Sequence, residues 1–131
     1  MIFFGHRFLK SEPLYHVFDI DSILHTPPAS TIYVEFDEKN LDIINHAVLN
    51  SVRTAVFVKN ITEILYASSL GASYIIIEKE LAKTAQNIAE NYLFDAKILA
   101  LVEDEDEIEE LALLGVDGVI FSGAIVKISS K

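Results

Sequence analysis

Polar side chains that could bind a ligand stand at the end of each apolar segment of strand length in this chain. They are Glu35 and Asp37 (segment 31–36), Lys59 and Asn60 (55–58), Glu78 and Lys79 (74–77), Glu103 and Asp104 (98–102), and Ser122 and Gly123 (119–121). The carboxyl ends of parallel strands meet at one edge of a sheet, where ligands bind. This mostly acidic row could bind Mg²⁺ through carboxylates and water, or its carboxylates could cap the helices that follow the strands. We favour capping.

A second group of candidate residues lies near the N-terminus, in the segment FFGHRF. Gly5, His6 and Arg7 form the one place in the sequence where basic side chains cluster with a glycine. They could hold an anion, and the alternative is a turn with solvated side chains. The predicted cofactor-binding or ligand-binding residues are Gly5, His6, Arg7, Asp37, Lys59, Asn60 and Glu78. The cofactor itself is not predicted.

Several classes of reaction lack the residues that they need. The chain has no cysteine, which excludes a disulfide framework, a thiolate metal site and a cysteine nucleophile. Its histidines show no HxxxH or HxH spacing; they are His6, His16, His25 and His46. No G-x-S-x-G, Walker A or G-x-G-x-x-G motif occurs. We therefore predict no catalytic residue and no metal site.

The acidic run 103–110 (EDEDEIEE) begins an amphipathic segment. The unsatisfied N–H groups at the start of a helix favour negative charge, so the run is typical of a helix start. Asp104 or Asp106 is predicted to cap the helix. So much negative charge at this position would oppose phosphate binding by the same helix.

The composition of the 131-residue chain limits its partners. A formal charge of −10 without a Lys/Arg cluster predicts that the chain does not bind nucleic acid. No apolar stretch approaches the roughly 20 residues that cross a bilayer, and Met1 is not followed by a signal sequence, so we expect a cytoplasmic protein without membrane insertion. The apolar fraction of 51% is slightly high and favours a homodimer that hides apolar surface.

Hydrophobic periodicity predicts alternating strands and helices. The apolar runs 31–36, 55–58, 74–77, 98–102 and 119–121 are typical of buried strands, and the segments between them carry apolar residues at helical spacing. The unit 58–77 aligns with the unit 102–121, with Gly71 on Gly115. Either a duplication or the shared requirements of strand–helix–strand units explain this similarity.

These elements predict one domain with parallel strands and right-handed crossovers. Residues 1–30 are interrupted by prolines and are expected to form an N-terminal arm or a degenerate first βα unit. Residues 2–4 of this segment are a candidate for a sixth strand. Residues 31–131 are expected to form the main Rossmann-like domain. A complete barrel needs about 250 residues, so we expect an open sheet. The predicted fold class is α/β, a Rossmann-like doubly wound parallel sheet of five to six strands in three layers.

Residues 31–126 resemble the N-terminal nucleotide-binding half of the domains that regulate potassium conductance in bacterial channels and transporters, the RCK or KTN family. The likeness rests on TIYVEFD (31–37), GASYIIIEKE (71–80) and ELALLGVDGVIF (110–121), with its G-x-D-x-V-I pattern. The resemblance implies a Rossmann-like fold and places Asp37 at the ribose-contacting position. The family's G-x-G-x-x-G turn is replaced by residues 5–9, GHRFL.

The closing unit also resembles that of phosphoacceptor receiver domains. Glu78, Val102 and Ser122 stand nearest the family's phosphoacceptor, hydroxyl and lysine positions, so phosphotransfer is not expected. We predict a small cytosolic, non-catalytic regulatory or ligand-sensing domain whose ligand is a nucleotide or another small molecule. One alternative is a Mg²⁺-dependent enzyme that acts on a small phosphorylated substrate at the carboxyl ends of the strands. The other is a receiver-like or scaffold domain without a ligand.

Overall fold

The computed structural model of the chain describes residues 1–128. The strands are β1 (Ile2–Phe4), β2 (Leu14–His16), β3 (Thr31–Glu35), β4 (Arg53–Phe57), β5 (Tyr74–Glu78), β6 (Lys97–Val102), β7 (Gly118–Phe121) and β8 (Ile125–Lys127). The α helices are α1 (Ile20–Ile23), α2 (Leu41–Leu49), α3 (Ile61–Leu70), α4 (Ala82–Asn91) and α5 (Ile108–Leu114). Short 3₁₀ helices are η1 (Glu38–Asn40), η2 (Lys79–Leu81), η3 (Glu105–Glu107) and η4 (Ser122–Ala124).

All of these strands belong to one sheet, in the order β1-β7-β6-β5-β4-β3-β2-β8. Every neighbouring pair is parallel. The α/β class, the parallel sheet and the strand–helix–strand units of a Rossmann-like fold are thus confirmed. The predicted number of five to six strands is wrong, since the described residues form eight. The strands not predicted, β2 and β8, have three residues each, which is too short for an apolar period to reveal them.

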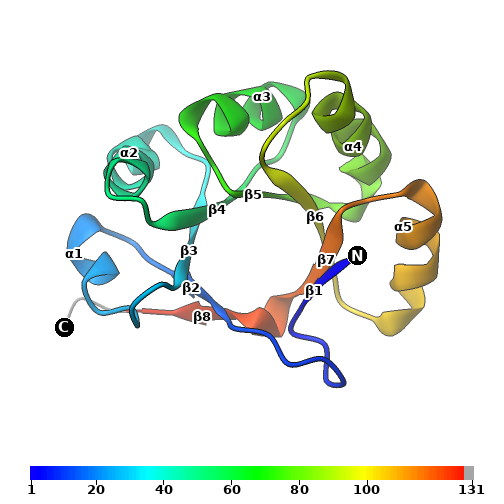
Figure 1. The fold of residues 1–131 in the computed structure, drawn as a ribbon, viewed down its shortest axis with the longest axis horizontal. Helices are drawn as coiled ribbons and strands as arrows, with labels where there is room; N and C mark the ends of the chain where they lie inside the picture. Colours follow the sequence, from blue (N-terminus) through cyan, green and yellow to red (C-terminus); the bar gives the residue numbers. More distant parts are fainter. Residues whose placement is uncertain (129–131) are drawn as a thin grey trace.

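The sheet curls into a ring, with the α helices around its outside (Figure 1). Consecutive strands from β2 to β7 are neighbours, so the chain adds each strand on the same side of the previous one. Crossovers of one hand then place every connecting helix on the same face. The expected layering, with helices on both faces of a doubly wound sheet, is therefore corrected to one helical layer around a curled sheet.

Each face of the sheet buries its own apolar cluster. Alternation along β3 places Ile32 and Val34 under the helices and Tyr33 on the inner face. The inner cluster consists of Leu14, Tyr33, Ala55, Ile76, Leu99, Ile120 and Ala124. Burial on both faces explains why the central strands are continuous apolar runs in the sequence. Within residues 1–128 the sheet is curled with five α helices, whereas a complete barrel has eight.

The contact between β1 and β7 depends on Gly118. Ile2 pairs with Gly118 in the register of the two strands. A Cβ atom at Gly118 would lie 2.6 Å from the Ile2 carbonyl oxygen and 2.8 Å from Leu99 Cδ2. Only glycine lets β1 approach β7 and β6 this closely.

Buried polar contacts hold the loop before β7. The Gln86 side chain of α4 is only 5% exposed. It donates to Asp117 Oδ1 (3.3 Å) and accepts from the Asp117 N–H (3.0 Å). The Ile98 N–H donates to Asp117 Oδ2 (2.8 Å). Asp117, the acid of the G-x-D pattern, thus joins α4, β6 and β7.

The first thirty residues take part in the same sheet. They supply β1, which pairs with β7, and β2, which pairs with β3 and β8. The last three residues of the expected 31–131 domain lie outside the described residues. Within residues 1–128, no helix has both the length and the apolar character needed to span a membrane.

Candidate functional site

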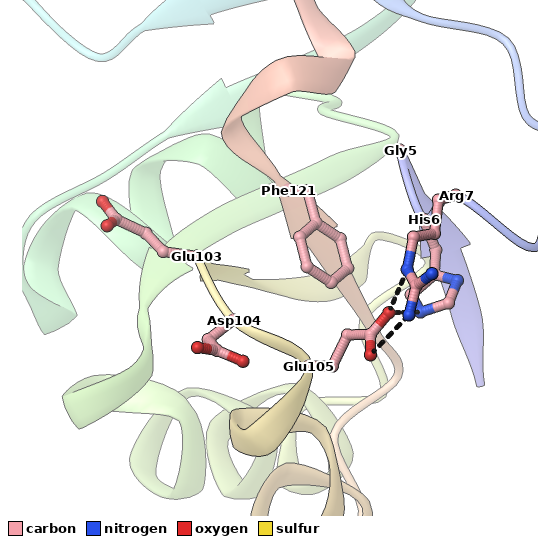
Figure 2. A pocket seen from close by; sticks show the side chains of 7 residues that line it. All are labelled: Gly5, His6, Arg7, Glu103, Asp104, Glu105 and Phe121. Carbon is pink, nitrogen blue, oxygen red and sulfur yellow. Dashed lines mark hydrogen bonds and ion pairs between the residues drawn. The ribbon is translucent and has the colours of Figure 1, made fainter.

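A pocket of about 380 Å³ lies at the carboxyl ends of β1, β6 and β7. Its lining residues come from the N-terminal segment, the start of η3 and the end of β7 (Figure 2). They are Gly5, His6, Arg7, Glu103, Asp104, Glu105 and Phe121. The predicted residues Gly5, His6 and Arg7 therefore lie in one pocket, and their position agrees with the edge at which ligands of parallel sheets bind.

Glu105 binds both basic side chains of the pocket. Its Oε1 atom lies 2.9 Å from Arg7 Nε and 3.0 Å from His6 Nε2. Arg7 Nη2 donates to Glu105 Oε2 at 3.4 Å. The hydrogen bond from Arg7 lowers the pKa of Glu105, and the same carboxylate raises the pKa of Arg7. Both groups reach solvent, so the ion pair contributes little to folding stability.

His6 is held among aromatic rings. Its ring lies edge-on to Phe121 (5.6 Å between centroids) and to Phe3 (6.3 Å). The Phe8 N–H donates to His6 Nδ1 at 3.1 Å, so Nδ1 carries no proton and Nε2 donates to Glu105. Arg7 lies over the Phe8 ring, 4.2 Å from its centroid. Residues 6–8 are thus held by aromatic contacts with β1 and β7 and by the contacts of Phe8.

Gly5 makes the turn that brings His6 and Arg7 over the end of β7. Its φ of +85° lies in the left-handed region, and a Cβ atom would be 2.9 Å from the Ala124 Cβ. The Gly5 N–H donates to Ser11 Oγ at 3.0 Å. Because this N–H is already used, Gly5 serves the turn and not a phosphate-binding loop.

The acidic side of the pocket begins a helix. Asp104 accepts from the Asp106 N–H, and Glu107 accepts from the Asp104 and Glu103 N–H groups in a capping box. Lys79 Nζ lies 2.7 Å from Glu107 Oε1. The predicted capping role of the acidic run is confirmed. Figure 2 shows the Glu103 side chain pointing away from the pair of Arg7 and Glu105.

The other predicted residues lie at the ends of other strands. Asp37 follows β3 and accepts from the Lys39 N–H, which caps η1. Asn60 follows β4 and accepts from the Glu63 N–H, which caps α3. Because four strands, β4 to β7, separate β3 from β1 along the sheet, Asp37 is not beside Gly5 as it would be in a dinucleotide site.

Lys59 and Glu78 complete the predicted set. The Lys59 N–H donates to Glu63 Oε1 at 2.9 Å, and the Lys59 side chain is exposed. Glu78 is the exposed last residue of β5. Neither residue lines the pocket of Figure 2. Within residues 1–128, no three His, Asp or Glu side chains converge as a metal site would require.

Two pocket residues were not predicted from the sequence. Glu105 was assigned only to the helix start, and Phe121 only to a buried strand. The pairing of Arg7 with Glu105 joins residues 98 positions apart, and no local pattern signals it. Comparison of the chain with known proteins gives no matching family model and no match among curated proteins.

Proposed function

We propose that this chain is a non-catalytic ligand-sensing module, and that its ligand is a nucleotide or nucleoside bound in the pocket of Figure 2. One observation carries the proposal: Arg7, the half-buried ring of Phe121, and the residues Glu103 and Asp104 line a single space of about 380 Å³. This volume is within the usual range of small-molecule sites.

The lining groups match the parts of such a ligand. The Phe121 ring offers a surface on which a base can stack. The Asp104 carboxylate can accept a hydrogen bond from a sugar hydroxyl, and the Arg7 guanidinium can donate to a phosphate in fork geometry. The acidic residues at the start of η3 oppose a phosphate there, so the phosphate contact is assigned to Arg7 of the N-terminal segment. Because the exposed pair of Arg7 and Glu105 is weak, a ligand phosphate can replace Glu105 on Arg7.

The same pair supports a sensing role. It joins the N-terminal segment to η3, two parts of the chain that are far apart in sequence. A ligand that replaces Glu105 would break this link beside the exposed side chains of Phe8 and Leu9. The proposal includes two further points: that the chain is related to the potassium-transport regulators that it resembles, and that it is located in the cytoplasm.

The first prediction concerns ligand-dependent stability. AMP at 100 times its Kd is expected to stabilise the chain by about 2.7 kcal/mol, which raises the Tm by roughly 10 °C. Arg7→Gln should remove most of this shift, because it removes the phosphate contact. A thermal-shift assay with AMP, adenosine and NAD⁺ measures the effect.

Lys10→Gln is the matched control, since Lys10 is an exposed cation of the same segment that does not line the pocket. It should keep the AMP shift of the unmodified chain. If none of the three compounds stabilises the chain at millimolar concentration, the proposal is wrong. An equal shift in Arg7→Gln and Lys10→Gln would place the ligand elsewhere.

A homodimer is the second prediction of this proposal. Its support is the apolar composition and several largely exposed leucines; Leu49, Leu93 and Leu113 are 83%, 85% and 84% exposed. Light scattering at micromolar concentration is expected to give twice the chain mass of 14.6 kDa. A mass of one chain would contradict it.

A further inference from the structure

A second pocket lies in the groove between α2 and α3, which are neighbours in the helical layer around the sheet (Figure 1). Its volume of about 460 Å³ is within the usual range of small-molecule sites. The lining residues come from the end of β3, from η1 and from the two helices. They are Phe36, Glu38, Leu41, Tyr66, Ser69 and Leu70. None of them lines the pocket of Figure 2.

Two aromatic rings line this groove, and the fold holds one of them firmly. The Phe36 N–H donates to the Phe57 carbonyl oxygen at 2.8 Å, and the Phe36 side chain packs against the core under the helices. The Tyr66 ring is stacked with the Phe36 ring, with 6.1 Å between centroids and 29° between planes. Because Tyr66 is 55% exposed, much of its surface is free to contact a ligand.

The rest of the lining is mainly apolar. Tyr66, Ser69 and Leu70 are three and four residues apart, so they share one face of α3. Leu70 also packs against the core under the helices. Leu41, the first residue of α2, completes the apolar lining. These side chains favour a ligand with a flat apolar body, which aromatic rings and leucines can contact over a large area.

The charge at this pocket is negative. Among residues 1–128, Glu38 is the one charged residue that lines it. No other group within that range forms an ion pair or a hydrogen bond with the Glu38 carboxylate. The surrounding segment 37–42 carries three carboxylates and one lysine, Lys39, which does not line the pocket. A positive charge on the ligand is therefore favoured and a negative charge opposed.

We propose that the groove between α2 and α3 binds an aromatic molecule that carries an ammonium group, of the arylalkylamine class. The flat ring of the ligand packs against Phe36 and Tyr66, and its ammonium group donates to the Glu38 carboxylate. The proposal does not depend on the nucleotide site, because the two pockets share no residue.

An NMR titration of the ¹⁵N-labelled full chain with tryptamine tests the proposal. Saturable shifts are expected for the amides of Phe36, Glu38 and Tyr66. Tyr66→Leu, which keeps an apolar side chain and removes the ring, should weaken binding at least fivefold. The matched control is Tyr92→Leu, since Tyr92 is an exposed tyrosine at the end of α4 that does not line the pocket. It should leave the affinity unchanged.

Related ligands separate the contribution of the ring from that of the charge. Indole-3-propionate has the same ring with a negative charge, and hexylammonium has the charge without a ring. Each should bind at least tenfold more weakly than tryptamine. Glu38→Gln should weaken tryptamine binding about threefold and leave the affinity for uncharged indole unchanged. Glu90→Gln, at an exposed glutamate of α4, is the control for this variant.

Three results would overturn the proposal. The first is the absence of saturable shifts at the groove with millimolar tryptamine. The second is an affinity for indole-3-propionate or hexylammonium equal to that for tryptamine. The third is a dimer that Tyr66→Leu dissociates, which would show that a second copy of the chain occupies the groove. Glu38→Gln keeps the test valid if Tyr66→Leu fails to fold, because Glu38 is exposed.

Discussion

Replacing Gly118 with alanine is expected to lower the free energy of unfolding by about 2–3 kcal/mol. The added Cβ would lie 2.6 Å from the Ile2 carbonyl oxygen and 2.7 Å from the Ile2 Cβ. These atoms belong to the first strand of the sheet, so they cannot move aside as the end of a flexible side chain would. Strand β1 must shift away from β7, which weakens three paired positions. Urea denaturation monitored by circular dichroism measures the loss.

Two other glycines serve as controls for this prediction. Gly123→Ala should change stability by less than about 0.5 kcal/mol, since its Cβ would meet nothing within 4 Å. Gly115→Ala should cost about 1 kcal/mol, because its φ is +79° although the surrounding space is open. If Gly118→Ala is as stable as Gly123→Ala, then β1 does not pack against β7 as described.

Replacing Asp117 with alanine is expected to cost about 2–3 kcal/mol. The carboxylate accepts from the Ile98 N–H and from Gln86, and the substitution leaves these donors without a partner. Gln86 is buried, so water cannot readily replace the lost contact. The same denaturation experiment measures the change.

The neighbouring Asp95→Ala is the matched control, because Asp95 is an exposed acid just before β6. It should leave stability nearly unchanged. Gln86→Ala combined with Asp117→Ala should cost less than the sum of the two single changes, since the residues share hydrogen bonds. Additive costs would show that the contact between α4 and this loop does not form.

The central strands could be predicted because they are buried on both faces. The apolar runs 31–36, 55–58, 74–77, 98–102 and 119–121 correspond to β3 to β7 within about two residues. The helix start after the run 98–102 was also predictable. Asp104, one of the two predicted caps, caps η3.

The curl of the sheet could not be predicted from the same patterns. Hydrophobic periodicity shows which residues are buried but not what buries them. A strand gives the same apolar run whether its second face lines the inside of a curled sheet or lies under helices on a flat sheet. The deciding elements are β2 and β8, which pair with each other at one end of the strand order. Both are short, and β2 directly follows Pro13.

Only the basic side of the candidate site could be predicted from the sequence. The combination of Gly5, His6 and Arg7 was visible because basic residues are rare in this acidic chain. Their partner Glu105 was hidden in an acidic run whose capping role explains its composition. The resemblance to potassium-transport regulators placed Asp37 in the site. In the structure Asp37 caps η1 after β3, which β4 to β7 separate from β1.

An NMR titration of the ¹⁵N-labelled chain with AMP tests the proposed function most directly. The account predicts saturable shifts for the amides of Gly5, His6 and Arg7 together with Glu103 and Glu105, while Asp37 and Asn60 remain unchanged. Shifts centred on Asp37 and Asn60, or no saturable shift at millimolar AMP, would contradict it.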